Sequence, residues 1–166
     1  PRILTDGEVD ILAVFKSNEP DTIRKKLGYE VVVWDPADYG VPVIGLTYVT
    51  RSELIEEDPD LLERFLKATM KGLQYAFDNR GETVDIVLRF AQNADREHQV
   101  FMLETEIADA TSPLTDEHGL GWMTAGQWRA LYDHLEAFEA LPEPFDVETV
   151  YTDRFLKAVY KDGVLR

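Results

Sequence analysis

Aromatic and polar side chains gather at one abrupt turn near the start of the chain. Phe15 ends an apolar run, and the polar residues Ser17, Asn18 and Glu19 follow it directly before a proline. A second aromatic residue, Tyr39, lies further on in a segment rich in proline and glycine. A small flat heterocycle needs an aromatic face for stacking and a few fixed polar groups for its ring edge. These five residues supply that combination, and we predict them as ligand-binding residues.

Structural roles for two of these residues are the alternative. Asn18 can cap a following helix, and Pro20 suits the first turn of that helix. Glu19 is then a favourable anion near the positive end of the helix dipole. As ligand-binding groups, the Asn18 amide can both donate and accept, whereas the Glu19 carboxylate can only accept. The partners that these two side chains have in the structure distinguish the two interpretations.

Three strands and a short helix are predicted around this turn. The continuous apolar residues before it indicate a buried strand at residues 9–15. A helix over residues 21–27 should end at Gly28 in the left-handed conformation. A run of three valines indicates a second strand at residues 30–34, and a third strand is predicted at residues 43–50. In α/β sheets, ligands lie beyond the carboxyl ends of strands, which is where the polar turn falls.

Helices dominate the chain from Ser52 onward. Asp58 and Pro59 open the longest of them, and its apolar residues recur at steps of three and four residues. Amphipathic patterns predict two more helices at residues 83–90 and 96–108. This region is therefore expected to be almost entirely helical.

The last third of the chain continues this helical pattern after a loop at residues 112–121. A capping-box pattern that starts at Thr124 opens a helix through Leu141, and a last helix is predicted at residues 152–161. Aromatic residues on the helical stripes of the chain are predicted to lie in the core; they are Phe65, Phe77, Phe90, Phe101, Trp128, Phe138 and Phe155.

The composition excludes several classes of site. The chain has 17 Lys and Arg residues against 32 Asp and Glu residues, a net charge of −15, which argues against a nucleic-acid partner. The absence of cysteine excludes disulfides, thiolate catalysis and zinc–thiolate sites. The histidines His98, His118 and His134 lack the spacing of metal ligands, and we interpret His98 and His134 as solvated surface residues. No metal and no cofactor is therefore expected.

Short motifs in a particular order give the chain a resemblance to a known family. It resembles the C-terminal half of SsuA/THI5-like solute-binding proteins of ABC importers, a group that includes thiamine-pyrimidine-precursor binders and flavin-binding relatives. The resemblance covers most of the chain. The motifs that carry it are Gly7-Glu8-Val9-Asp10, Asn18-Glu19-Pro20, Asp38-Tyr39-Gly40-Val41-Pro42, Leu46-Thr47-Tyr48-Val49-Thr50, the Asp58-Pro59 helix start, Phe65-Leu66-Lys67-Ala68-Thr69-Met70-Lys71-Gly72 and, more weakly, Gly121-Trp122-Met123-Thr124.

The resemblance implies an α/β fold, namely the helix-rich C-terminal part of a two-lobed periplasmic-binding-protein fold of type II. Residues 1–34 would be the end of lobe two, with a strand, a helix and a strand. Residues 35–42 would form the hinge crossing, and residues 43–166 would return to lobe one as one strand followed by helices. A signal sequence and the first half of the protein would then lie upstream. The open edges of the incomplete sheets would favour a homo-oligomer.

In function, the resemblance implies a solute-binding protein and not an enzyme. It would bind a small heterocyclic vitamin precursor, a thiamine pyrimidine or a flavin-like molecule, by clamshell closure of two lobes. Its partner would be the permease of an ABC transporter. Its location would be periplasmic or extracellular, with membrane association through the upstream region.

One departure from the family pattern bears on the ligand. Pyrimidine-binding relatives carry an aromatic–Trp–Asn–aromatic–Glu pattern after this strand, whereas residues 15–19 read Phe-Lys-Ser-Asn-Glu. The missing tryptophan makes another flat heterocycle an alternative to the pyrimidine. Two further alternatives are a ligand-sensing domain of a signalling protein and a pyrimidine synthase of the same fold, which would use a histidine. No histidine is expected near the polar turn.

Overall fold

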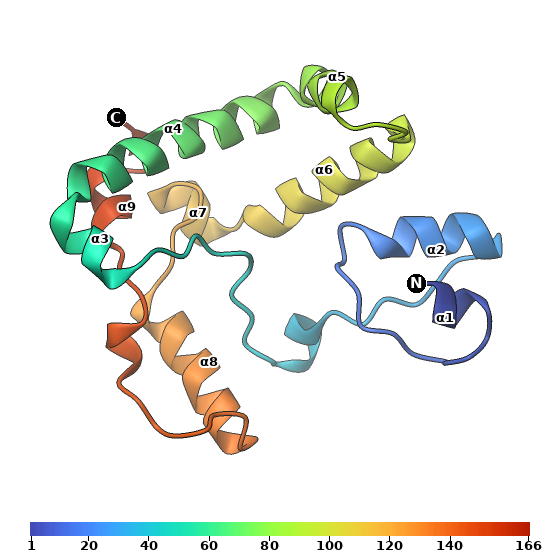
Figure 1. Ribbon diagram of the computed structural model, residues 1–166, viewed down its shortest axis with the longest axis horizontal. Helices are drawn as coiled ribbons and strands as arrows, with labels where there is room; N and C mark the ends of the chain where they lie inside the picture. The colour runs from blue at the N-terminus through green and yellow to red at the C-terminus, as the bar shows by residue number, and fades with distance from the viewer. The chain divides into compact units, whose positions relative to one another are not determined.

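A computed structural model describes all residues 1–166, and it divides the chain into two compact units (Figure 1). The first unit comprises Pro1–Asp35 and Tyr75–Asp109, and the second comprises Pro36–Gln74 and Ala110–Arg166. Almost all regular structure is helical. The one sheet is an antiparallel hairpin in which Tyr160 pairs with Leu165 and Lys161 with Val164.

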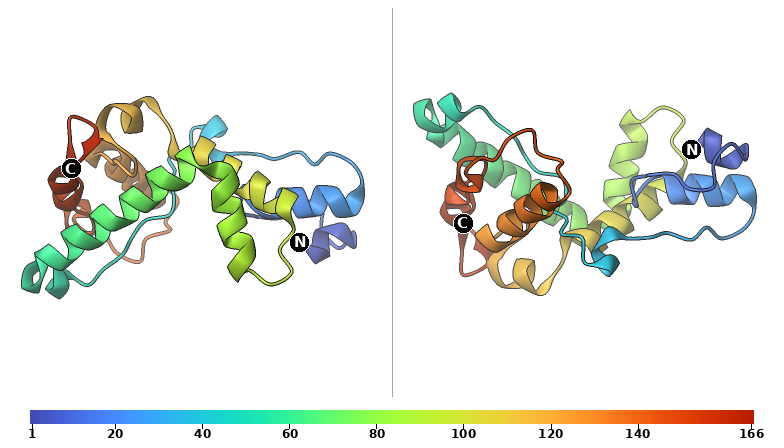
Figure 2. Two further views of the ribbon diagram at one scale, coloured as in Figure 1. Left: turned by 90° about the horizontal axis from the view of Figure 1, so that it is seen from above. Right: turned by 90° about the horizontal axis from the view of Figure 1, so that it is seen from below.

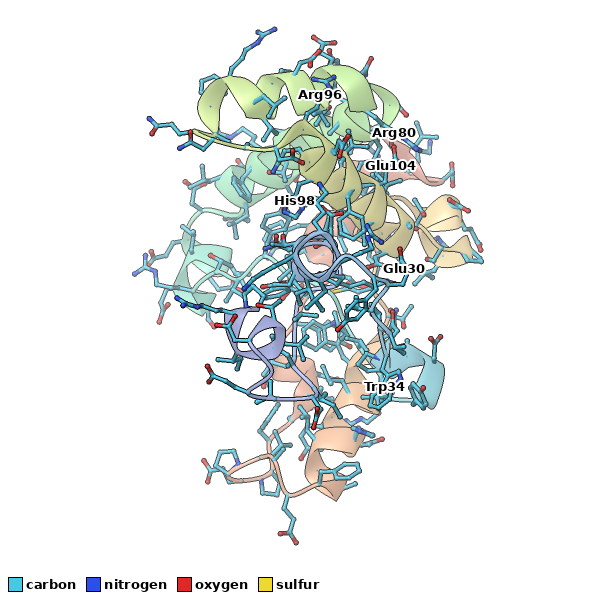
Figure 3. All side chains as sticks on the ribbon, turned by 90° about the vertical axis from the view of Figure 1, so that its right-hand side faces the viewer. Glu30, Trp34, Arg80, Arg96, His98 and Glu104 are labelled. Atoms are coloured by element: carbon cyan, nitrogen blue, oxygen red, sulfur yellow. The ribbon has the colours of Figure 1, made fainter.

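Four helices form most of the first unit. They are α1 (Arg2–Thr5), α2 (Glu19–Leu27), α5 (Arg80–Phe90) and α6 (Arg96–Ala110). Helix α6 lies between α5 and α2 (Figures 1 and 2). Two ion pairs join α5 to α6, since Arg80 Nη1 lies 2.7 Å from Glu104 Oε2 and Arg96 pairs with Asp85 (Figure 3). The predicted end of α2 is confirmed, because Gly28 follows it with a φ of 75° in the left-handed region.

The second unit contains the remaining elements. They are η1 (Pro36–Tyr39), α3 (Ser52–Glu57), most of α4 (Pro59–Asp78), α7 (Pro113–His118), α8 (Ala125–Ala137), η2 (Val147–Thr149), α9 (Arg154–Val159), β1 (Tyr160–Lys161) and β2 (Val164–Leu165). A buried cluster of Met70, Leu156, Val159 and Tyr160 forms its core. Six partly buried residues pack against that cluster, namely Leu66, Leu73, Leu120, Trp122, Met123 and Leu165. The core therefore joins α4 to α9 and the hairpin.

The predicted helices are present, and two of them start at the predicted capping signals. The last helix is shorter than predicted, because α9 covers Arg154–Val159 and Tyr160–Lys161 form β1. Asp58 Oδ1 accepts from Leu61 N at 3.0 Å at the start of α4. At the start of α8, the Thr124 hydroxyl accepts from the backbone N–H of Gln127, as the capping box predicts. Helix α8 ends at Ala137, earlier than the predicted Leu141.

The loop predicted at residues 112–121 is wrong in part. Residues Pro113–His118 form the short helix α7. Ser112 and Thr115 make a capping box, with Pro113 at the first helical position. The same start signal that identified α8 was therefore present here, without the apolar periodicity of a longer helix.

The three predicted strands at residues 9–15, 30–34 and 43–50 are absent, and this is the largest correction to the sequence-based fold. These segments have no strand paired with them, because the only ladder in the chain is the β1–β2 hairpin. A strand is defined by hydrogen bonds to a neighbouring strand, and β propensity alone does not provide one. The side chains of these segments are not buried as expected either, since Ile11, Val32 and Val49 are 68%, 84% and 90% exposed.

Several aromatic residues predicted for the core are also exposed. Phe155 is buried as predicted. Phe65 is half exposed, and Phe90 and Phe138 are 83% and 72% exposed. Phe90 is the last residue of α5 and Phe138 follows the end of α8, so both lie where a helical stripe no longer faces a neighbour. The two-lobed α/β architecture itself stays a prediction.

The unpaired apolar segments lead us to expect self-association. Unpaired backbone groups of extended segments and uncovered apolar side chains favour pairing with a second chain. In sedimentation velocity, the mean sedimentation coefficient should rise with protein concentration. The substitution Val32→Lys should shift the protein toward the monomer, because a charge in an uncovered apolar segment opposes the pairing of that segment with another chain. The matched change Val150→Lys, at a residue that is 51% exposed and lies outside these segments and the hairpin, should leave association unchanged. A compact monomer at all concentrations would contradict this expectation.

Candidate functional site

The residues predicted to bind a ligand begin at a tight turn, which we call the elbow (residues 15–19). The backbone N–H of Asn18 donates to the carbonyl of Phe15 at 2.9 Å. The backbone N–H of Phe15 donates in turn to Glu19 Oε2, also at 2.9 Å. Phe15 itself is 65% exposed, Ser17 is buried, and Asn18 and Glu19 are half-buried. The elbow therefore presents an aromatic face and places two polar side chains at the start of α2.

Asn18 has a different role from the helix cap that the sequence suggested. It precedes α2, but its side chain makes no capping hydrogen bond. Its Oδ1 atom instead lies 3.0 Å from Nε2 of His98. His98 belongs to the first turn of α6 (Figure 3). The prediction that His98 is a solvated surface residue is wrong, because its side chain is only 19% exposed. The expectation that no histidine lies near the polar turn is wrong as well.

Asp21 is a buried acid that the sequence analysis did not single out. It is 4% exposed. Its carboxylate accepts from Arg24 Nη2 at 2.9 Å, and its other oxygen lies 3.1 Å from Lys25 Nζ and 2.9 Å from His98 Nδ1. Burial raises the pKa of Asp21, but hydrogen bonds from His98, Lys25 and Arg24 outweigh it and hold the pKa below its ordinary value. Asp21 is thus an ionised anchor between α2 and α6.

We expect the substitution Asp21→Asn to lower the free energy of unfolding by about 2 kcal/mol at neutral pH. The loss of one partner of a fully buried ion pair lowers the free energy of unfolding by more than this. The effect is smaller here because Arg24 and Lys25, the cationic partners of Asp21, are partly exposed. Because the folded pKa is lowered, the contribution is present above the unfolded pKa of about 3.9 and is lost as the pH falls through the folded value. Urea unfolding of both proteins from about pH 2 to 7 measures this.

The matched control for that experiment is Asp6→Asn. Asp6 pairs with Arg2 and Lys26 in an exposed position, and we expect little change from its replacement. If the free energies of unfolding of the Asp21 variant and the native chain differ by the same amount at every pH, the ionised Asp21 carboxylate does not stabilise the contact between α2 and α6.

Lys16 connects the elbow to two other parts of the first unit. Its Nζ atom lies 2.7 Å from Asp109 Oδ1 near the end of α6, and 2.9 Å from Asp35 Oδ2. Hydrogen bonds to Asp109 and then to Asp35 hold the pKa of Lys16 well above its ordinary value. This residue was not predicted to matter, because a pair separated by 93 residues leaves no local signal in a sequence. Lys16 helps to fix the position of the elbow.

The structure brings together four of the five predicted site residues. Phe15, Ser17, Asn18 and Glu19 form the elbow in the first unit, whereas Tyr39 ends η1 in the second unit and is 70% exposed. The participation of Tyr39 in one site with the elbow stays a prediction. No group of three or more histidine, aspartate or glutamate side chains is arranged to hold a metal ion.

The elbow carries the kinds of group that the predicted binding of a flat ring requires. The exposed Phe15 ring offers a face for stacking, and the Glu19 carboxylate and the Asn18 amide offer hydrogen-bonding groups for a ring edge. Glu19 Oε2 is already bonded to the backbone of Phe15, so a ligand donor would use Oε1. The Asn18 amide also contacts His98, so the imidazole lies beside the elbow.

Comparison with known proteins identifies a family and relatives that are similar to this chain. The family described as NMT1/THI5 like matches residues 2–83. The riboflavin-binding protein RibY of Chloroflexus aurantiacus is 28% identical over 155 residues, which cover 91% of this chain and 43% of that protein. The formylaminopyrimidine-binding protein of Halalkalibacterium halodurans is 22% identical over 151 residues, which cover 90% of this chain and 46% of that protein. These findings confirm the resemblance to SsuA/THI5-like solute-binding proteins.

Three further findings accompany these similarities. The chain spans about half the length of the curated relatives it matches. No solved structure matches it significantly. None of its helices combines the length and the apolar character needed to cross a membrane.

Proposed function

We propose that this chain is part of a solute-binding protein that binds a small heterocycle, a flavin or a pyrimidine vitamin precursor, for uptake by an ABC transporter. The observation that carries the proposal is that relatives matching nine-tenths of the chain are named as binding proteins for riboflavin and for formylaminopyrimidine. The elbow supports it, because it combines an exposed aromatic ring with a carboxylate and an amide.

In this proposal the elbow binds the ligand without making or breaking a covalent bond. The Phe15 ring stacks on the heterocycle, and Glu19 accepts a hydrogen bond from a ring N–H or an amino group. Asn18 bonds a second position on the ring edge. A transporter permease as partner, a periplasmic or extracellular location, and closure of two lobes about residues 35–42 complete the proposal.

A riboflavin titration followed by two-dimensional ¹⁵N NMR tests this proposal on the 166-residue chain. We expect shift changes concentrated at residues 15–19, with an affinity for the monomer weaker than micromolar. The weak affinity follows because these residues alone can bury only part of the ligand surface. Ribitol is the matched control, since it carries the polyol of riboflavin without the ring, and it should leave these signals unchanged. Shift changes that avoid the elbow, or no shift changes with either riboflavin or formylaminopyrimidine, would overturn the proposed function.

A further inference from the structure

His98 has a different partner on each nitrogen of its ring. Its Nδ1 atom lies 2.9 Å from Oδ2 of Asp21, and its Nε2 atom lies 3.0 Å from Oδ1 of Asn18. The ring of Phe101 stacks on the imidazole with centroids 6.4 Å apart. The imidazole is therefore held between α2 and α6, directly beside the elbow.

Asp21 determines where the imidazole carries a hydrogen. An ionised carboxylate only accepts hydrogen bonds, and contacts with Arg24 and Lys25 keep Asp21 ionised. The Nδ1 atom of His98 must then donate to Asp21 whether the ring is charged or neutral. The change between the two forms of the ring falls on Nε2, the nitrogen that faces Asn18.

The two forms of His98 require opposite orientations of the Asn18 amide. A charged ring donates from Nε2, so the Oδ1 atom of Asn18 faces it and the NH₂ group points away. A neutral ring with its hydrogen on Nδ1 accepts at Nε2, so the NH₂ group of Asn18 must face it. A half-turn of the amide exchanges the two groups, and this terminal torsion has a broad, roughly two-fold preference.

We propose that His98 is a positioning residue that sets which polar group the Asn18 amide offers to a ligand. This inference rests on the proposed function, in which Asn18 bonds the edge of a heterocycle. The amide offers its NH₂ group when the imidazole is charged and its carbonyl when the imidazole is neutral. The elbow then favours ring edges rich in carbonyl oxygens in the first state and ring edges with amino groups in the second.

Charged groups of both signs surround the imidazole. Helix α2 contributes Asp21, Arg24 and Lys25. At the start of α6, Asp95 Oδ1 accepts from the backbone N–H of His98 at 2.7 Å, and Glu97 lies 3.8 Å from Lys25. The test therefore covers the whole range from about pH 5 to 8, within which histidine side chains change charge.

The first experiment needs no ligand. NMR spectra of the free chain from pH 5 to 8 follow the ring nitrogens of His98 and the side-chain amide of Asn18. We expect the Asn18 amide signals to shift with the same midpoint as the ring. The variant His98→Gln should abolish this shift, whereas the control His134→Gln, on a helix of the other unit, should leave it intact. If His98 titrates and the Asn18 amide stays still, the inference is overturned; this result from the native chain decides even if the variant fails to fold.

The second experiment uses riboflavin as the probe, at pH 5.5 and pH 8. The edge of its ring carries two carbonyl oxygens, so we expect about tenfold tighter binding at pH 5.5, the effect of about one hydrogen bond. This ratio should disappear in His98→Gln and persist in His134→Gln. Equal affinities at both pH values would overturn the inference. Absence of riboflavin binding at both pH values would overturn a flavin as the ligand of the proposed function, and the ligand-free titration would still decide the coupling of His98 to Asn18.

Discussion

Glu19→Gln is expected to weaken binding of formylaminopyrimidine by about ten- to a hundredfold. An amino group that donates to the Glu19 carboxylate makes a charge-assisted hydrogen bond, and its loss corresponds to about 1.5–3 kcal/mol. The glutamine keeps the size of the side chain, and its carbonyl can still accept from the backbone N–H of Phe15 at the elbow. An NMR titration of both proteins measures the ratio of the two dissociation constants.

Two controls make this result specific to the ligand. The substitution should change the free energy of unfolding by less than it changes the free energy of binding. The reason is that a charge in the first turn of a helix contributes only about 0.3–1 kcal/mol to stability. Glu8 precedes the elbow in the sequence, and the control substitution Glu8→Gln should leave the affinity unchanged. If the Glu19 variant binds formylaminopyrimidine as well as the native chain, Glu19 is only a structural residue of the elbow.

Met70→Ala is expected to lower the free energy of unfolding of the second unit by about 2–5 kcal/mol. Met70 is 3% exposed and lies at the centre of the buried cluster that joins α4 to α9 and the hairpin. Truncation removes buried apolar surface and leaves a cavity that the surrounding side chains fill only in part. Because a domain has only about 5–15 kcal/mol of stability, this change is a large fraction of the whole. Tryptophan fluorescence during urea unfolding reports it, since Trp122 packs against this cluster.

The matched control is Leu46→Ala. Leu46 is 87% exposed in the segment predicted to be the third strand, so its truncation should have little effect on stability. Equal losses of stability in the two variants would show that the second unit has no core centred on Met70.

Local signals in the sequence predicted the helices well and the strands poorly. The helix starts at Asp58 and Thr124 and the helix end at Gly28 depend on residues within four positions, and all three are present in the structure. The segment at residues 30–34 has equally strong β propensity, but a strand also needs a neighbour to accept and donate its backbone hydrogen bonds. That neighbour is not encoded in the segment itself.

In the candidate site, too, local features were predicted from the sequence and long-range contacts were not. The aromatic and polar residues of the elbow were visible because they are adjacent in the sequence. Their partners were not, since His98 lies 80 residues from Asn18 and 77 residues from Asp21. A histidine among charged residues on a helix is typical of the surface, and only the packing of α6 against α2 gives His98 its role.

The most direct test of the account is the position of riboflavin on the chain, measured by intermolecular nuclear Overhauser effects. These effects can be observed even when binding is weak, because the ligand exchanges rapidly. We predict contacts from the protons of the flavin ring to the ring of Phe15 and to the side-chain amide of Asn18, and their loss in Phe15→Ala. Contacts from the flavin ring only to residues outside the elbow would contradict the central claim that residues 15–19 bind the heterocycle.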